Sequence, residues 1–96
     1  MMLYEWDEAK REANLLKHGL DFVLAPVVHE AEFKLTLASP RGNELRWVDV
    51  VEVEKGLILS LVYTYRVDAI RVISLRKADR KERNLYDKAK DQPPQQ

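Results

Sequence analysis

Two apolar runs separated by a short polar break constrain the fold of this chain more than any other feature. The first extends from Leu57 to Tyr65 and the second from Ile70 to Arg76, and both are rich in β-branched and aromatic residues. The break between them, residues 66–69, is short enough to form a hairpin loop. We therefore expect two neighbouring antiparallel strands.

The pairing of these strands predicts one apolar and one more polar face, because side chains alternate along a strand. In an uninterrupted register, the apolar face carries Leu59, Leu61, Tyr63, Tyr65, Ile73 and Leu75, with Arg71 near its end. The other face carries Ser60, Val62, Thr64, Val72 and Ser74, with Arg66 and Arg76 at its ends. We expect helices to cover the first face and the second face to line a groove.

Charge is distributed unevenly, although the formal net charge of the whole chain is zero. Residues 1–56 hold seven Lys/Arg and eleven Asp/Glu, whereas residues 57–96 hold nine and five. Seven cations and three acids lie between Arg66 and Arg83. Such a local excess attracts polyanions. The alternative is that the acidic and basic halves neutralise each other across the fold.

Composition limits the class of protein. The 96 residues are enough for one domain, expected over residues 1–90, with a polar and disordered tail at residues 91–96. The absence of cysteine excludes disulfides and thiolate chemistry. With two histidines and no acidic cluster at metal spacing, we expect neither a metal nor a cofactor. The lack of cysteine fits a reducing cytoplasm, where we expect the protein to be. No run reaches membrane-spanning length, so we expect no membrane contacts.

Two helices are predicted in the first third of the chain, after a short strand at residues 3–6. The first helix is expected from Glu8 to His18, between an Asp7 N-cap and Gly19. Its predicted buried side is Ala9, Ala13 and Leu16, and its polar stripe is Lys10, Asn14, Lys17 and His18. A shorter helix is expected from Asp21 to Ala31, burying Phe22, Ala25 and Val28 and starting irregularly because of Pro26. His29 is expected to pack rather than to bind a ligand.

The remaining elements complete an α+β pattern. Strands are expected at residues 32–37 and 44–53, and residues 54–56 form a turn into Leu57. Arg46, Val48 and Val50 share one face of the second of these strands. Asp79 caps a third helix from Arg80 to about residue 90, with Leu85 and Ala89 on its inner side. Helices and strands are segregated, which indicates an α+β fold.

Several segments together resemble the BrnT-type toxins. They are Tyr4 to Lys10, Ala13-Asn14-Leu15, Lys17-His18-Gly19, Glu44 to Trp47, Val62-Tyr63-Thr64, Ile70 to Ala78, and Arg80 to Arg83 with Tyr86. The resemblance covers roughly residues 3–86. It implies a RelE-like fold with two N-terminal helices packed on a small antiparallel sheet and a C-terminal helix. It also implies a metal-independent endoribonuclease toxin of a type II toxin–antitoxin module. The partner would be a cognate small DNA-binding antitoxin (BrnA-like), through which alone the toxin reaches operator DNA.

Metal-free RNA cleavage requires a base, an acid and cations that stabilise the charge developing at phosphorus. Arginine suits the last role because its planar fork binds two phosphate oxygens and stays charged. With the resemblance, we predict His18, Arg46, Arg66 and Arg76 as catalytic residues. We predict that Lys10, Lys17, Arg71, Lys77 and Arg80 bind RNA, and we keep Glu44, Tyr63 and Lys17 as further acid–base candidates.

Structural roles are the alternative for each of these residues. Arginines beside a hairpin turn are ordinary, Arg76 has Asp79 and Glu82 within reach along the chain, and His18 sits where a helix ends. At the level of function, the alternative is a non-catalytic toxin-like interaction module or a nucleic-acid-binding regulator.

Overall fold

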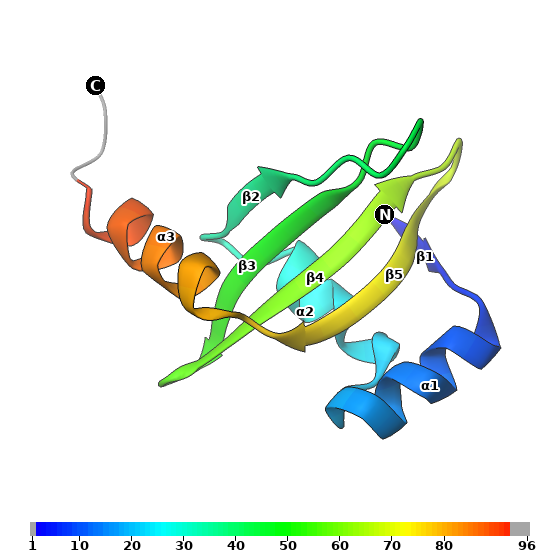
Figure 1. Ribbon diagram of the computed structural model, residues 1–96, viewed down its shortest axis with the longest axis horizontal. Helices are drawn as coiled ribbons and strands as arrows, with labels where there is room; N and C mark the ends of the chain where they lie inside the picture. Colours follow the sequence, from blue (N-terminus) through cyan, green and yellow to red (C-terminus); the bar gives the residue numbers. More distant parts are fainter. Residues whose placement is uncertain (1, 93–96) are drawn as a thin grey trace.

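The computed structural model describes residues 2–92 and contains a five-stranded sheet with helices on both faces (Figure 1). In chain order the elements are β1 (Leu3–Glu5), α1 (Glu8–His18), the 3-10 turn η1 (Phe22–Leu24), α2 (Ala25–His29), β2 (Leu35–Ala38), β3 (Trp47–Glu54), β4 (Leu57–Tyr65), β5 (Ala69–Lys77) and α3 (Arg80–Asp91). The α+β class predicted from the sequence is confirmed, while the likeness to RelE-type folds stays a prediction.

The strand order is β1-β5-β4-β3-β2. Strands β2 to β5 pair antiparallel, as expected, but β1 pairs parallel with β5 along Leu3–Glu5 and Ala69–Arg71. The prediction of a wholly antiparallel sheet is therefore wrong at this edge. A parallel pair needs a long crossover, and here the whole chain between β1 and β5 supplies it.

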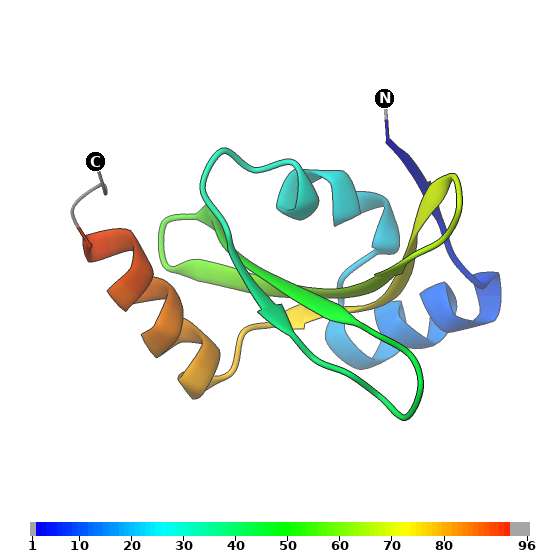
Figure 2. The same ribbon diagram turned by 90° about the horizontal axis from the view of Figure 1, so that it is seen from above.

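The two faces of the sheet carry separate cores, with α2 on one side and α3 on the other (Figure 2). On the α2 side, the predicted helix residues Phe22, Ala25 and Val28 are fully buried against the sheet. The irregular start is also confirmed, because η1 precedes α2 and Pro26 lies in its first turn, where it costs no hydrogen bond. On the α3 side, Val48 and Val50 pack with Ala78 and Tyr86.

A β-bulge interrupts the register between β4 and β5. Val62 pairs with Ser74 but Tyr63 pairs with Val72, so Ile73 is an extra residue in β5. One extra residue in a strand moves each side chain that precedes it to the opposite face of the sheet, relative to the uninterrupted register. The predicted faces are therefore wrong before the bulge: Val72 is buried in the core under α2, and Arg71, opposite Thr64, lies on the same face as Arg76.

Helix α1 packs with the opposite side from the one predicted. Ala9 and Ala13 are exposed and Leu16 is 90% exposed, whereas Asn14 is buried. Asn14 donates from Nδ2 to the Leu20 and Leu75 carbonyls and accepts from the Leu75 amide through Oδ1. The unpaired edge of β5 needs a polar partner, and this asparagine supplies it.

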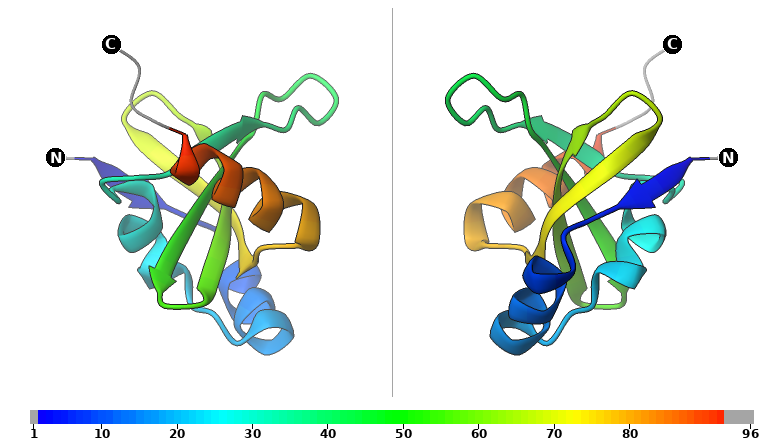
Figure 3. Two further views of the ribbon diagram at one scale, coloured as in Figure 1. Left: turned by 90° about the vertical axis from the view of Figure 1, so that its left-hand side faces the viewer. Right: turned by 90° about the vertical axis from the view of Figure 1, so that its right-hand side faces the viewer.

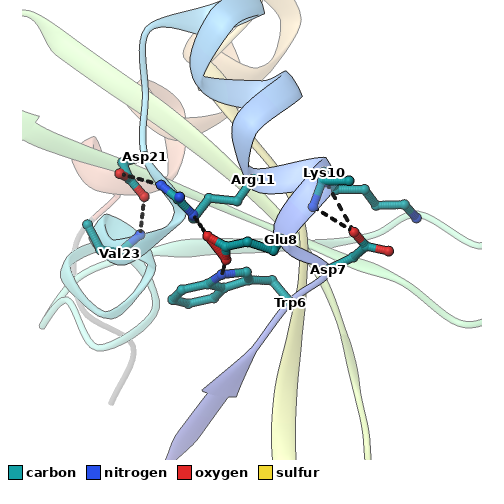
Figure 4. A network of polar contacts seen from close by, with 8 residues as sticks. Trp6, Asp7, Glu8, Lys10, Arg11, Asp21 and Val23 are labelled. Carbon is teal, nitrogen blue, oxygen red and sulfur yellow. Dashed lines mark hydrogen bonds and ion pairs between the residues drawn. The ribbon is translucent and has the colours of Figure 1, made fainter.

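The start of α1 is fixed by a polar network (Figure 4). Asp7 accepts from the Ala9 and Lys10 amides at 2.8 and 3.3 Å, as the capping prediction requires. Arg11 pairs with Glu8 and donates to Asp21 at 3.1 Å, which joins α1 to the segment that caps η1. The first turn of α1 is therefore held in place beside the sheet.

Helix α3 is also rotated relative to the prediction. Asp79 and Glu82 form a capping box, and the buried residues are Glu82 and Tyr86, while Leu85 is exposed. The polar partners that Glu82 finds on the sheet explain this rotation. The expected tail begins at Asp91, which belongs to α3, and beyond Gln92 it lies outside the described residues. None of the helices within residues 2–92 is long and apolar enough to cross a membrane.

Candidate nucleic-acid interface

Two adjoining hollows on the α3 side of the sheet form a basic cleft that extends from Lys10, in the first turn of α1, to Arg76 on β5. The hollows measure about 140 and 230 Å³ and meet at Arg46 and Ile73. We define the basic cleft by the polar residues that line them: Lys10, Ser39, Arg41, Glu44, Arg46, Thr64, Arg66, Arg71, Ser74 and Arg76. The cations come from α1, the β2–β3 loop, the β4–β5 hairpin and β5.

Glu44 lies between two of these arginines. Its carboxylate accepts from Arg46 Nε at 2.6 Å and lies 3.6 Å from Arg66 Nη1. The hydrogen bond from Arg46 holds the pKa of Glu44 below its usual value, and Arg66 adds to this effect. The cleft therefore contains an ionised carboxylate at neutral pH, close to two guanidinium groups that can bind phosphate.

Arg71 reaches the same cleft because of the bulge at Ile73. Its Nη1 lies 2.8 Å from Glu5 Oε2, so β1 orients the side chain while it lines the hollow with Lys10. Within residues 2–92 neither Lys10 nor Arg41 forms an ion pair. These two cations carry charge that the rest of the described chain does not offset.

Arg76 lies at the other end of the cleft, where it joins β5 to α3. Its guanidinium donates two hydrogen bonds to Glu82, at 2.7 and 3.0 Å. Glu82 also accepts from Ser60 Oγ at 2.9 Å and from the Asp79 amide at 2.9 Å. Burial alone would raise the pKa of Glu82, but the hydrogen bond from Arg76 and these two further bonds lower it overall. The hydrogen bond to Glu82 in turn raises the pKa of Arg76.

The remaining predicted residues lie outside the basic cleft. Lys17 and His18 end α1, and His18 lies about 12 Å along the helix axis from Lys10 at a rise of roughly 1.5 Å per residue. Lys77 pairs with Leu59 at the far end of β5, and Arg80 lines a separate hollow on α3 with Lys81. The structure brings together Arg46, Arg66, Arg71 and Lys10, with Arg76 at one end.

The acid–base candidate Tyr63 is buried on the opposite side of the sheet. Its hydroxyl donates to the fully buried Asp49 at 2.9 Å, and burial followed by the charge of Asp49 raises its pKa. Asp49 also accepts from Lys34 at 2.8 Å and from Thr36 at 2.7 Å. This network is a structural feature of the core. His29 is half-buried beside it, in edge-on contact with Tyr4 and Tyr63, as expected of a packing residue.

Sequence reasoning missed Arg41 as a residue of the cleft, kept Glu44 only as a further acid–base candidate, and placed Arg71 on the wrong face of the sheet. Arg41 lies in a loop whose path no periodic pattern predicts, and the bulge that redirects Arg71 has no signal in the sequence. The acid at position 44 two residues before Arg46 was a usable signal, because alternate residues of an extended chain face the same side.

The chain thus combines a small α+β fold with an arginine-rich cleft on one face of its sheet, a charge pattern of the kind that attracts polyanions. Residues 6–82 match the family described as ribonuclease toxin, BrnT, of type II toxin–antitoxin system. The chain belongs to this BrnT family.

One solved structure similar to this fold is the ribonuclease toxin BrnT of Brucella abortus, determined by crystallography at 1.1 Å resolution. The two structures have a TM-score of 0.62 and 28% sequence identity over 83% of this chain and 100% of the other. No curated protein sequence matches this chain significantly.

Proposed function

We propose that this chain is the endoribonuclease toxin of a type II toxin–antitoxin module and that it cuts RNA without a metal ion. The observation that carries the proposal is the convergence of Arg46, Arg66, Arg71 and Lys10 around Glu44 in one cleft. Membership of the BrnT family supports the same activity.

The cleavage step needs only groups that a protein side chain can supply. The ribose 2′-oxygen attacks the adjacent phosphorus, its proton passes to a base, and the bond from phosphorus to the 5′-oxygen breaks. An acid protonates that oxygen, leaving a 2′,3′-cyclic phosphate and a 5′-hydroxyl. Arg46 and Arg66 stabilise the negative charge on the phosphorane oxygens, a role that suits preorganised guanidinium groups.

Glu44 is the acid–base group that the geometry favours. Its carboxylate is ionised in the free protein because Arg46, and then Arg66, stabilise the charged form and lower its pKa. A phosphate that binds these arginines competes for their donors, which weakens the hold on the carboxylate and makes Glu44 a better proton acceptor. His18 was predicted as a catalytic residue, but it lies at the distal end of α1, away from Glu44 and outside the basic cleft.

The cognate antitoxin, a small DNA-binding protein, is proposed to cover the basic cleft with an acidic or apolar segment. The unpaired charge of Lys10 and Arg41 supports an acidic segment. Charge complementarity of this kind speeds association and makes the rate fall as salt rises. Association rates that are the same at low and high salt would argue against a contact with the cleft.

Cleavage of RNA by the purified chain in the presence of EDTA tests the proposal. We expect the products to carry 5′-hydroxyl and 2′,3′-cyclic phosphate ends, and we expect expression of the chain to arrest growth. The antitoxin should abolish both the cleavage and the growth arrest. Glu44→Gln is expected to bind RNA and fail to cut it. An intact RNA after incubation with folded parental protein would favour the alternative, a non-catalytic module that binds RNA or its partner.

A further inference from the structure

The β2–β3 loop and the β4–β5 hairpin diverge at one end of the sheet (Figure 3). Residues of both segments line a hollow next to the basic cleft that is larger than either hollow of the cleft. Its volume is about 630 Å³, within the range of roughly 300–1,000 Å³ that holds small organic groups. Among the residues that line it are Asn43, Leu45 and Trp47 from the first segment and Thr64, Tyr65 and Arg66 from the second.

Two of the residues that line this hollow are aromatic, Trp47 and Tyr65. Tyr65 is 53% exposed at the end of β4, with its ring edge-on to Tyr63 at a centroid distance of 5.7 Å. Trp47 packs against the core under α2 and also lines the hollow. A tyrosine ring that is half exposed and lines the hollow can stack on a planar ligand.

The walls are fixed before any ligand arrives. Thr64 Oγ1 donates to the Leu45 carbonyl at 2.8 Å, which ties β4 to the loop. Arg41 and Glu44 exchange two backbone hydrogen bonds of 2.9 Å across the loop tip. On the opposite side, the Arg66 amide donates to the Ala69 carbonyl at 2.8 Å. Ordering a ligand there therefore costs little rearrangement of the backbone.

The hollow also offers groups that read polar edges. Asn43 is exposed, and its side-chain amide can both donate and accept. Within the described part of the chain, this amide forms no side-chain hydrogen bond. A planar ligand that stacks on Tyr65 can therefore be recognised by its edge as well as by its face.

The aromatic hollow and the basic cleft share Arg41, Glu44, Thr64 and Arg66. A ligand spanning both needs an aromatic ring joined to an anionic group, and a nucleotide has this composition. An apolar side chain would fill the hollow without using Arg66. We propose that this hollow binds the nucleobase of a nucleotide beside the scissile phosphate, which would give the cleavage a base preference. The inference rests on the proposed function, because it places RNA in the adjoining cleft.

Binding of short 2′-O-methylated oligoribonucleotides tests this assignment, since they lack the attacking hydroxyl and cannot be cut. In a series of these oligonucleotides, each member has one abasic position. The affinity of each member is measured for the parental chain and for the variants Tyr65→Ala, Tyr65→Phe and Val67→Ala. Val67 is 99% exposed at the tip of the same hairpin and does not line the hollow, so it serves as the matched control. A melt of each variant shows that it is folded.

We expect one abasic position to weaken binding to the parental chain about tenfold, the scale of one base stacked on an aromatic ring. Tyr65→Ala should weaken binding of the intact oligonucleotide by the same factor, and it should not change the affinity for the oligonucleotide that is abasic at this position. Tyr65→Phe and Val67→Ala should bind the intact oligonucleotide as tightly as the parental chain does. If parental protein binds and cuts RNA but Tyr65→Ala binds the intact oligonucleotide as tightly, the base pocket is wrong while the ribonuclease proposal stands. Parental protein that binds no oligonucleotide refutes both. Loss of antitoxin affinity alone in Tyr65→Ala would assign the hollow to the protein partner and overturn the inference.

Discussion

Arg71 and Arg76 face the same cleft although Arg76 is the fifth residue after Arg71 along β5. On a regular strand they would point to opposite sides of the sheet. The extra residue Ile73 restores their common facing, and it lies where the two hollows of the basic cleft meet. Bulges often redirect side chains beside functional sites in this way. The groove expected from the sequence is thus more basic than its pattern predicts.

Replacing Arg46 with Ala should lower the cleavage rate by about a hundred- to a thousand-fold, the usual loss for one preorganised donor to a developing oxyanion. Arg46→Lys should recover only part of the rate, because an ammonium group cannot form the two-pronged contact. Single-turnover cleavage at saturating protein measures this effect. Lys81→Ala, an exposed change on α3 outside the cleft, is the control. If Arg46→Ala cleaves RNA at the parental rate, Arg46 has no role in the cleavage step.

Arg76 is expected to matter for stability as well as for RNA. Arg76→Ala leaves the buried Glu82 carboxylate without its bidentate partner, at a cost of about 1–3 kcal/mol in the free energy of unfolding. The double variant Arg76→Ala/Glu82→Gln should regain part of this, because no charge is then left unpaired. Denaturant titrations of the two single variants and the double variant measure the coupling. Additive effects would show that the pair contributes nothing.

Stability should fall in acid because of the same carboxylate. The pKa of Glu82 is lower in the folded chain than its ordinary value of 4.5, so the folded state binds its proton less readily than the unfolded state. The stabilisation is therefore complete above about pH 5 and disappears as the pH falls through the folded-state pKa. Melting temperatures between about pH 3 and 7 should drop less steeply in Glu82→Gln than in the parent. Glu12→Gln, an exposed change on α1, should follow the parental curve.

Asp49 should be among the most sensitive core positions. Its side chain is fully buried and accepts hydrogen bonds from Lys34, Thr36 and Tyr63. Removing one partner of such a buried pair typically costs about 3–5 kcal/mol, so Asp49→Ala should be unfolded or strongly destabilised. Asp68→Ala, at the exposed tip of the β4–β5 hairpin, should be neutral. Equal unfolding midpoints for these two variants would contradict the structural role of the buried network.

The features predicted well from the sequence are those with local causes. Asp7 and Asp79 cap helices because their side chains bond the first free amides, and Pro26 begins a helix because its ring suits the first turn. The alternation in β3 correctly puts Val48 and Val50 on one face of the strand, and the structure shows that this face packs with Ala78 and Tyr86. Each of these needs only a few neighbouring residues.

The features predicted wrongly depend on partners distant in sequence. Asn14 turns inward because the edge of β5 has backbone groups without strand partners, which leaves Leu16 exposed. Glu82 turns inward because Arg76 and Ser60 offer it hydrogen bonds. A hydrophobic pattern cannot anticipate either, since both helices bury a polar residue. The bulge at Ile73 likewise follows from how two strands pair.

Cleavage of an RNA that carries a single 2′-deoxy nucleotide at the cut position tests the proposed chemistry most directly. The parental chain, assayed in EDTA, should cut the all-ribose RNA and leave this one intact at that position, because the attacking oxygen is missing. Binding of the two RNAs should be similar, which separates the missing nucleophile from lost affinity. Cleavage of the deoxy-substituted RNA at the same bond and the same rate would contradict attack by the 2′-hydroxyl.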